Sequence, residues 1–242
     1  MSEILKLFFL FFIGCTTGWI MEVLFRRFNK QNVDRKWINP GFLTGPYLPL
    51  YGFGLCILYL LAGLEKYNLI ANPIWNKVVL FIAMAFCMTL IEYIAGVIFI
   101  VGMKVKLWDY SKEKFNYKGI ICLRFSIIWA ILGALYYFCI HPYIINALDW
   151  FSKNLEFSFI LGTFFGVFMV DVCYSFNVVS KIRKFAKENN VLIKYEELKH
   201  HIRKSAEDAK EKYRFLFAFS TREPLKEYLK KYIEKLKLMD KK

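Results

Sequence analysis

The sequence predicts an all-α, polytopic membrane protein with about five transmembrane helices and a cytoplasmic helical tail. Hydrophobic residues make up 57% of the chain, and they collect in long runs that hold few charges. The net charge of +14 lies mostly outside these runs, and residues 181–242 alone hold 19 Lys and Arg against 10 Asp and Glu. We therefore expect a transmembrane helical domain at residues 1–180 and a basic cytoplasmic tail at residues 181–242.

Each predicted span holds roughly 20 mainly apolar residues, the length that crosses the hydrocarbon core of a bilayer. The five spans cover residues 4–25, 46–64, 78–103, 119–140 and 157–179. The first run has no basic region before it and no small-residue cleavage site after it. We therefore expect it to be an uncleaved span and not a signal peptide.

Lysine and arginine alternate between the connections that join these spans. The first and third connections each hold five such residues, whereas the second holds two at its edges and the fourth holds one. Basic residues favour the cytoplasmic side of a membrane. The predicted protein therefore lies in the cell membrane with its N-terminus outside and its C-terminus in the cytoplasm.

The tail is predicted to form two helical pieces. Residues 181–219 favour helix with a break near Glu188-Asn189-Asn190, and a second piece follows Pro224. Apolar residues in the second piece recur at three- and four-residue spacing, which is typical of an amphipathic helix. The apolar positions are Leu225, Tyr228, Leu229, Tyr232, Ile233 and Leu236. Such a helix packs on a neighbour, pairs with a second copy or lies on the membrane, and its basic surroundings favour anionic lipids.

The stretch from Asn39 to Gly54 is apolar but holds three prolines and four glycines. Proline removes a backbone donor and glycine permits unusual dihedral angles, so this stretch is not expected to be regular helix throughout. Irregular backbone at membrane depth must be buried in protein or line a wet cavity. Two interpretations follow: one wall of an inward-facing pocket, or a tight structural corner between two helices.

Three carboxylates, Glu22, Glu92 and Asp171, lie inside the predicted spans. Ionised groups at this depth are costly, so each is a functional candidate. Glu22 lies near the inner end of its span, where Arg26 at the i+4 position offers a local ion pair. Glu92 lies near the middle of its span and is either functional or a hydrogen-bonded packing residue. Asp171 is either functional or paired with Arg124.

Glycines at four-residue spacing predict where helices approach each other closely. Gly14 and Gly18 form such a pair in the first span, and Gly162 and Gly166 form another in the fifth. At 100° per residue Asp171 points away from Gly162. The fifth span is therefore expected to have a packing face and an opposite polar face.

Residues 108–129 hold a second concentration of polar and aromatic side chains. Asp109 before Ser111 suits a turn or a helix N-cap, while the group together with Arg124 also suits an anionic head group. The predicted orientation places this group and the Asn39–Gly54 stretch on the same side, so we expect one shared pocket. Its candidate residues are Glu22, Asn39, Thr44, Tyr51, Glu92, Trp108, Asp109, Tyr110, Ser111, Asn116, Arg124, Ser126, Trp129 and Asp171.

Several classes of activity lack their sequence signatures. The chain has no G-x-x-x-x-G-K-[ST] phosphate loop and no hydrolase or zinc-protease motif, so it is not expected to be an ATPase itself. The six cysteines lie in apolar runs and the three histidines lack ligand partners at metal spacing, so neither metal nor cofactor is expected. No nucleic-acid-binding module is present. Catalysis with Glu92 or Asp171 as general base is retained as an alternative.

Three sequence features together resemble one bacterial family that is common in Firmicutes. They are NPGFLTGPYLPLYG at residues 39–52, Glu92, and WDYS at 108–111 followed by Asn116, GIICL at 119–123, Ser126 and Trp129. The chain resembles the ABC-transporter permease family called type IV, or CmpB-like, from about Leu7 to Asp171. The basic tail lies outside the resemblance.

The resemblance implies the membrane component of a transporter that works with a separate ATPase subunit. Two other functions are kept open. One is a membrane enzyme that acts on a lipid or lipid-linked substrate at the cytoplasmic face, and the other is a regulatory or scaffolding protein whose basic tail binds anionic membrane or a partner. Self-association into a homo-oligomer is also left open.

Overall fold

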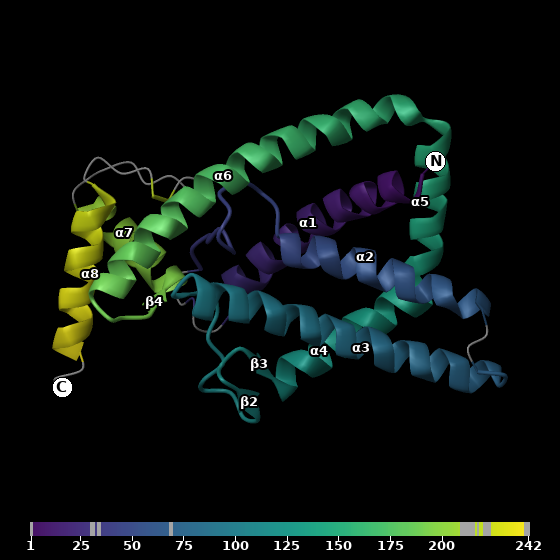
Figure 1. Cartoon of the computed structure of the whole chain (residues 1–242), viewed down its shortest axis with the longest axis horizontal. Coiled ribbons are helices and arrows are strands. Elements are labelled where there is room, and N and C mark those ends of the chain that lie inside the picture. Colours follow the sequence, from purple (N-terminus) through teal and green to yellow (C-terminus); the bar gives the residue numbers. More distant parts are fainter. Residues whose placement is uncertain are drawn as a thin grey trace. The chain divides into compact units, whose positions relative to one another are not determined.

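The computed structural model describes residues 2–29, 32, 35–67, 70–208, 216, 218–219 and 224–239, and most of them are helical (Figure 1). The α-helices are α1 (Glu3–Phe28), α2 (Pro49–Gly63), α3 (Pro73–Val97), α4 (Leu123–Leu135), α5 (His141–Lys153), α6 (Ser158–Glu188), α7 (Tyr195–Asp208) and α8 (Leu225–Met239). Short 3-10 turns η1 (Leu64–Tyr67) and η4 (Leu155–Phe157) and π-helical segments η2 (Ile98–Gly102) and η3 (Tyr136–Ile140) adjoin them. Two-residue strands are β1 (Val105–Lys106), β2 (Asn116–Tyr117), β3 (Ile121–Cys122) and β4 (Ile193–Lys194).

Five helices in the described part of the chain are long and apolar enough to cross a membrane. They cover Glu3–Phe28, Pro49–Tyr67, Pro73–Gly102, Leu123–Lys153 and Leu155–Glu188. The all-α, polytopic fold is therefore as predicted from the sequence. The predicted spans and the observed helices differ mainly at the helix ends. A helix continues beyond its apolar run wherever its backbone hydrogen bonds can continue.

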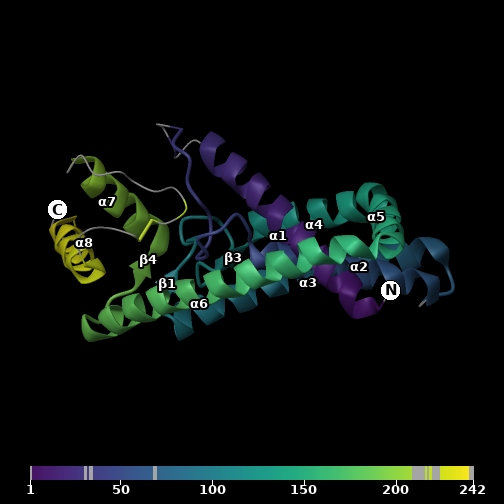
Figure 2. The ribbon, with the colours of Figure 1, turned by 90° about the horizontal axis from the view of Figure 1, so that it is seen from above.

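The fourth span differs most from its predicted range of residues 119–140. It begins later, because Ile121 and Cys122 pair with Tyr117 and Asn116 in a small antiparallel hairpin. It also continues through the π-helical segment η3 into α5, which the sequence analysis assigned to a connection. A π-segment followed by Pro142 in the first turn of α5 is a common cause of a change in helix direction. Figures 1 and 2 show α5 oriented steeply to α2 and α3.

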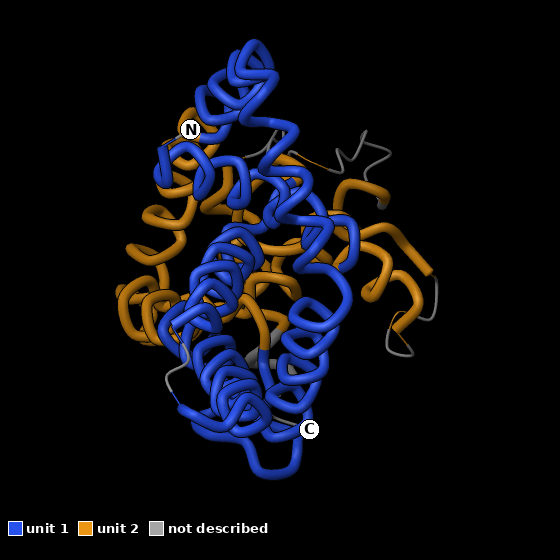
Figure 3. Tube along the Cα trace, turned by 90° about the vertical axis from the view of Figure 1, so that its right-hand side faces the viewer, with its two compact units in different colours: residues 1–21, 47–95, 109–168 blue, residues 22–46, 96–108, 169–242 orange. Residues whose placement is uncertain are grey.

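The chain divides into two compact units (Figure 3). The first unit contains residues 1–21, 47–95 and 109–168, and the second contains residues 22–46, 96–108 and 169–242. Helices α1, α3 and α6 contribute residues to both units. The division between a membrane domain and a tail at residue 180 is a separate matter and stays a prediction.

In the first unit, α1 and α2 approach each other through glycines. A Cβ atom on Gly14 would lie 2.7 Å from the carbonyl oxygen of Tyr51, and one on Gly18 would overlap the Tyr51 ring. This closeness lets the backbone N–H of Leu48 donate to the carbonyl of Cys15 at 3.0 Å. The packing role predicted for Gly14 and Gly18 is confirmed.

The glycine prediction for the fifth span is wrong. A Cβ atom added to Gly162 or Gly166 would meet nothing within 4 Å among the described residues. These glycines therefore do not mark a helix-packing face inside the first unit. In this part of α6 the packing is instead aromatic: Phe164 and Phe168 both contact Tyr47, with ring centroids 5.6 and 5.3 Å away.

The second unit has its own hydrophobic core, built where α7 and α8 pack beside the C-terminal part of α6 (Figures 1 and 2). Tyr228, Leu229, Tyr232 and Ile233 of α8 are all buried in it. The apolar stripe of the tail is therefore covered by the protein itself. Of the three interpretations of the sequence, this is the one in which the helix packs on a neighbouring helix. The side chain of Leu236, the last member of that stripe, lies outside the described residues.

The predicted break near residues 188–190 is confirmed, because α6 ends at Glu188 and Asn190 has a φ of 51°. The chain then forms β4, whose Ile193 pairs in parallel with Val105 of β1. The helix predicted to run on to Phe219 ends earlier, since α7 ends at Asp208 and Phe219 lies in a turn. Residues 209–215 lie outside the described part of the chain.

Candidate functional site

The candidate residues fall into two sets, one in each unit. The first unit holds Tyr51, Glu92, Asp109, Tyr110, Ser111, Asn116, Arg124, Ser126 and Trp129. The second unit holds Glu22, Asn39, Thr44, Trp108 and Asp171. Each set contains one buried carboxylate, Glu92 in the first unit and Asp171 in the second.

The Glu92 group consists of Glu92, Tyr110 and Trp129. Only 3% of Glu92 is exposed, and its carboxylate accepts hydrogen bonds from Tyr110 Oη at 2.9 Å and from Trp129 Nε1 at 3.1 Å. The Tyr110 ring stacks on Phe125 with centroids 4.4 Å apart, and the Tyr51 ring lies 5.4 Å from that of Trp129. Two neutral donors, each fixed by an aromatic neighbour, therefore hold both carboxylate oxygens.

This arrangement keeps a titratable group inside a membrane-spanning helix. A carboxylate at the centre of a span costs about 3 kcal/mol on insertion scales, and hydrogen bonds from Tyr110 and Trp129 offset part of that cost. An ionised Glu92 accepts protons, cations and polar hydrogens, whereas a protonated Glu92 is a hydrogen-bond donor. Its chemistry therefore permits hydrogen bonding in either protonation state.

The polar residues of the connection after β1 mainly organise that connection. Asp109 Oδ1 accepts from the backbone N–H of Ser111 at 3.0 Å, which is the turn predicted from the sequence. Asn116 donates to the carbonyl of Glu113 at 2.8 Å and accepts from the N–H of Gly119 at 3.1 Å. These bonds position the segment that supplies Tyr110.

The remaining candidates of this region have different surroundings. Arg124, which the sequence offered as a partner for Asp171, ion-pairs with Glu113 at 3.2 Å, and 66% of its side chain is exposed. Ser126 is half-buried on α4. Trp108 packs against the hydrophobic core of the second unit. A head-group site that uses Arg124 stays a prediction.

The second carboxylate, Asp171 of α6, binds the irregular stretch that we name the motif loop, residues 37–45. Its oxygens accept from the backbone N–H groups of Thr44 at 3.0 Å and Gly45 at 2.7 Å. The hydroxyls of Thr44 and Ser175 also donate to it, at 2.6 and 2.8 Å. Asp171 therefore satisfies backbone donors that the loop cannot satisfy by helical hydrogen bonds.

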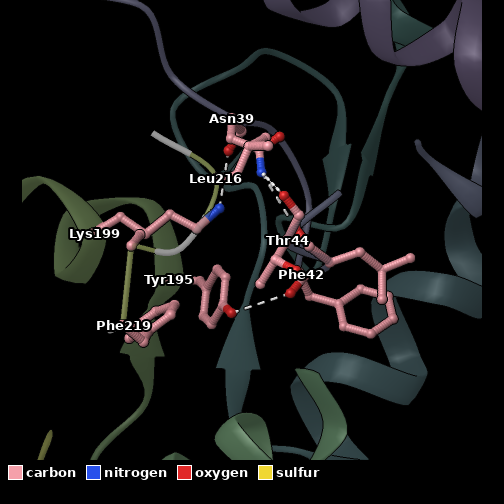
Figure 4. Close-up of a pocket in the computed structure, with 9 residues that line it drawn as sticks. Asn39, Phe42, Thr44, Tyr195, Lys199, Leu216 and Phe219 are labelled. Carbon is pink, nitrogen blue, oxygen red and sulfur yellow. Dashed lines mark hydrogen bonds between the residues drawn. The ribbon is translucent and has the colours of Figure 1, made fainter. Parts of the chain in front are cut away.

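Helix α7 holds the carbonyl groups of the same loop, as Figure 4 shows in part. Lys199 Nζ donates to the carbonyls of Asn39 at 2.9 Å and Gly41 at 2.7 Å. Tyr195 Oη donates to the carbonyl of Phe42 at 3.2 Å. Four residues beyond Lys199, Arg203 donates to the carbonyl of Trp37 at 3.1 Å. Because residues four apart share a helix face, one side of α7 follows the loop in the antiparallel direction.

Tyr195, Lys199 and Arg203 were not among the candidates predicted from the sequence. Their four-residue spacing puts three long donors on one helical face, which is the one local signal available. The acceptors are backbone carbonyls about 150 to 170 residues earlier in the chain. Every residue has a carbonyl, so the sequence does not indicate which of them accept.

Lys199 is almost fully buried, with 6% of the residue exposed. Burial lowers its pKa, and the nearby Arg26 lowers it further, whereas Glu196, 3.7 Å away, raises it. Burial also holds the pKa of Tyr195 well above its usual value. The ammonium group is thus surrounded by carbonyls, a carboxylate and an aromatic ring whose centroid is 4.8 Å away.

Glu22 forms the local ion pair that the sequence suggested. Arg26 Nε lies 2.9 Å from Glu22, and Arg26 Nη1 lies 3.2 Å from Glu196 of α7. Arg26 therefore links the end of α1 to the helix that carries Lys199.

A small cavity lies between the motif loop and α7, with lining residues that include Asn39, Thr44, Tyr195 and Lys199 (Figure 4). Its volume of about 10 Å³ is room for the centre of one water molecule. A larger solute would require the loop or α7 to move. No group of three or more His, Cys, Asp or Glu residues that suits a metal ion occurs in the described ranges.

Five apolar spans with carboxylates held inside two of them define a polytopic α-helical membrane protein with polar groups within its membrane-spanning helices. The chain belongs to the family described as "Putative ABC-transporter type IV", whose profile matches residues 9–176. No curated protein and no solved structure matches the chain. The matched range contains the motif loop, the Glu92 group and Asp171, and it ends before α7. The family resemblance seen in the sequence is confirmed.

Proposed function

We propose that the chain is the permease-like membrane subunit of an ABC-type transporter and that a separate ATPase subunit drives it. Family membership supports an ABC-transporter-related membrane component. The sequence has no phosphate loop, and in this proposal ATP hydrolysis is supplied by another chain. In this proposal the N-terminus faces outward and the C-terminus faces the cytoplasm, in accord with the distribution of Lys and Arg.

The observation that carries the proposal is the Glu92 group. A carboxylate with 3% exposure is kept in the third span by donors from two other segments, both within the range that the family profile matches. At this depth a carboxylate costs more free energy than an apolar side chain, so a residue needed only for packing is expected to be apolar. Glu92 is therefore assigned the role of the polar group that a transported solute or proton meets inside the membrane.

The basic end of α6 has its own part in this proposal. Lys181, Lys184 and Lys187 are exposed and lie on one side of the last two turns, directly after the apolar run. Each basic residue near an anionic leaflet contributes about 1 kcal/mol of attraction. We assign these lysines to anionic lipid head groups at the cytoplasmic surface.

The test has two parts. The tagged full-length chain is purified in mild detergent from its native membranes, and co-purified proteins are identified by mass spectrometry and assayed for vanadate-sensitive ATP hydrolysis. In parallel, cells that lack the gene are compared with wild-type cells for depletion of solutes from a defined medium. We expect a phosphate-loop ATPase in the complex and slower uptake of at least one solute in the deletion strain.

Glu92→Gln is then compared with Thr89→Val. Thr89 is a neighbouring polar residue whose hydroxyl donates to the carbonyl of Ala85 in its own helix. We expect Glu92→Gln to retain the ATPase but lose uptake, and Thr89→Val to behave as wild type. Absence of an ATPase from the complex, together with unchanged uptake after deletion, would overturn the transport proposal. Changed lipid composition in the deletion strain would favour the membrane-enzyme alternative.

A further inference from the structure

The motif loop is held on two sides by groups of opposite charge that belong to different helices. Asp171 of α6 accepts hydrogen bonds from backbone N–H groups at the end of the loop. Lys199 of α7 donates hydrogen bonds to backbone carbonyls near its beginning. The loop contains Pro40, and Gly41 has a φ of 75°, so it lacks a regular hydrogen-bond pattern of its own. Within the loop, Asn39 Nδ2 donates to the carbonyl of Thr44 at 2.9 Å, and the external partners supply further hydrogen bonds to the loop backbone.

We propose that Lys199 is a positioning residue for the motif loop, and that the C-terminal segment, through α7, sets the conformation of this family motif. Displacement of α7 then releases the loop and opens the small cavity beside it. This role concerns the loop itself and is independent of whether the chain transports a solute.

Three observations carry the proposal. Lys199 is buried and donates to two carbonyls, so its removal leaves acceptors without a strong donor. Tyr195 and Arg203, on the same face of α7, bind carbonyls on either side of that pair. The helix that carries them is fixed in turn, since Leu198 and Ile202 are fully buried in the core of the second unit.

Lys199 is the central residue of the row that Tyr195, Lys199 and Arg203 form on one face of α7. Its ammonium group donates to two loop carbonyls, those of Asn39 and Gly41, and the Tyr195 hydroxyl donates to the carbonyl of Phe42. Charge-assisted hydrogen bonds are also the stronger kind. Loss of Lys199 should therefore loosen the loop more than loss of the Tyr195 hydroxyl.

The experiment measures amide hydrogen exchange of the full-length protein in detergent, for peptides that cover residues 36–45. Lys199→Ala is expected to speed exchange in this segment about tenfold or more. Lys204→Ala, at an exposed position on the same helix, is the matched control and should leave exchange unchanged. Peptides from α4 serve as an internal reference for global loosening.

Chemical rescue separates positioning from a general loss of packing. Alanine at position 199 lacks three carbons and the ammonium group, which are the atoms of n-propylammonium, and the neighbouring cavity adds room for it. n-Propylammonium should slow loop exchange in Lys199→Ala back toward the wild-type rate. Tetramethylammonium carries the same charge but no N–H donor, so it should not.

Unchanged loop exchange in Lys199→Ala, equal rescue by both cations, or an equal rise in α4 peptides would each overturn the proposal. If Lys199→Ala does not fold, Tyr195→Phe gives the decisive measurement, because it removes one hydroxyl from the same row. Its expected effect is faster exchange confined to residues near Phe42, and wild-type exchange there would overturn the proposal.

Discussion

Asp171 and Lys199 bind the same loop through opposite ends of its peptide groups. The carboxylate accepts the N–H groups of Thr44 and Gly45, and the ammonium group donates to the carbonyls of Asn39 and Gly41. One partner comes from a membrane-spanning helix and the other from the tail. Side chains from two helices therefore satisfy backbone polar groups of this glycine- and proline-rich stretch, as buried backbone requires.

Asp171→Asn tests the first of these partners. The amide has one acceptor oxygen, and its NH₂ group would face the donors of Thr44 and Gly45. We expect the variant to lose on the order of 2–4 kcal/mol of stability, because hydrogen bonds to a charged acceptor are lost and donors are left unpaired. Thermal unfolding in detergent, followed by tryptophan fluorescence, measures the loss.

Asp149→Asn is the matched control for that variant. Asp149 pairs with Lys153 at 2.7 Å, but both side chains are mostly exposed, and exposed pairs contribute little. Equal melting temperatures for Asp171→Asn and Asp149→Asn would contradict the role assigned to Asp171.

Tyr110→Phe and Glu92→Gln test the Glu92 group as a pair. Tyr110→Phe removes one donor from a buried carboxylate and should destabilise the protein by about 1–3 kcal/mol. Combined with Glu92→Gln, its effect should shrink, because the donor then serves a neutral acceptor. A double-mutant cycle of unfolding free energies measures the coupling, and strict additivity would show that the two side chains do not interact. Tyr143→Phe, at an exposed tyrosine, controls for the substitution itself.

Gly14→Ala should be strongly destabilising. The added Cβ would lie 2.7 Å from the Tyr51 carbonyl oxygen and 2.9 Å from Gly52 Cα, and backbone atoms cannot move aside without separating α1 from α2. Gly162→Ala should be neutral or stabilising, since its Cβ meets no described atom within 4 Å and alanine favours helix. Melting temperatures of the two variants in the same detergent give the comparison, and similar values would argue against close α1–α2 packing.

Acidification should lower the folding stability of the tail through protonation of His201. Burial lowers the pKa of His201 below its usual 6.5, and Lys235 and Lys231 lower it further. Between the folded pKa and 6.5 the unfolded chain binds more protons than the folded chain, so stability falls as pH falls through this window. Its Nε2 is buried without a hydrogen-bond partner in the described part of the chain, and the ring lies 5.9 Å from Tyr232.

His201→Gln should therefore lose less stability than wild type between pH 7 and pH 5. His200→Gln, at the exposed neighbouring position, should follow the wild-type pH profile. Thermal melts across that pH range provide the measurement. Identical pH profiles for all three proteins would show that His201 does not contribute to the acid sensitivity.

The sequence by itself determined those features that depend on neighbours along the chain. The spans follow from apolar run length, the break after Glu188 follows from two asparagines, and the Glu22–Arg26 pair follows from i+4 spacing. The glycine rule succeeded in α1 and failed in α6. Spacing places small residues on one helix face but does not indicate whether another helix covers that face.

The tertiary structure alone decided which partners meet across long separations. Asp171 lies 127 residues from Thr44, and Lys199 lies 160 residues from Asn39. In both cases the loop contributes backbone groups, which are the same in every non-proline residue and leave no mark in the sequence. The irregular stretch that contains the motif loop could therefore be recognised from its prolines and glycines, and Asp171 from its position inside a span. That Asp171 and Lys199 both bind this loop is decided only when the folded chain brings them together.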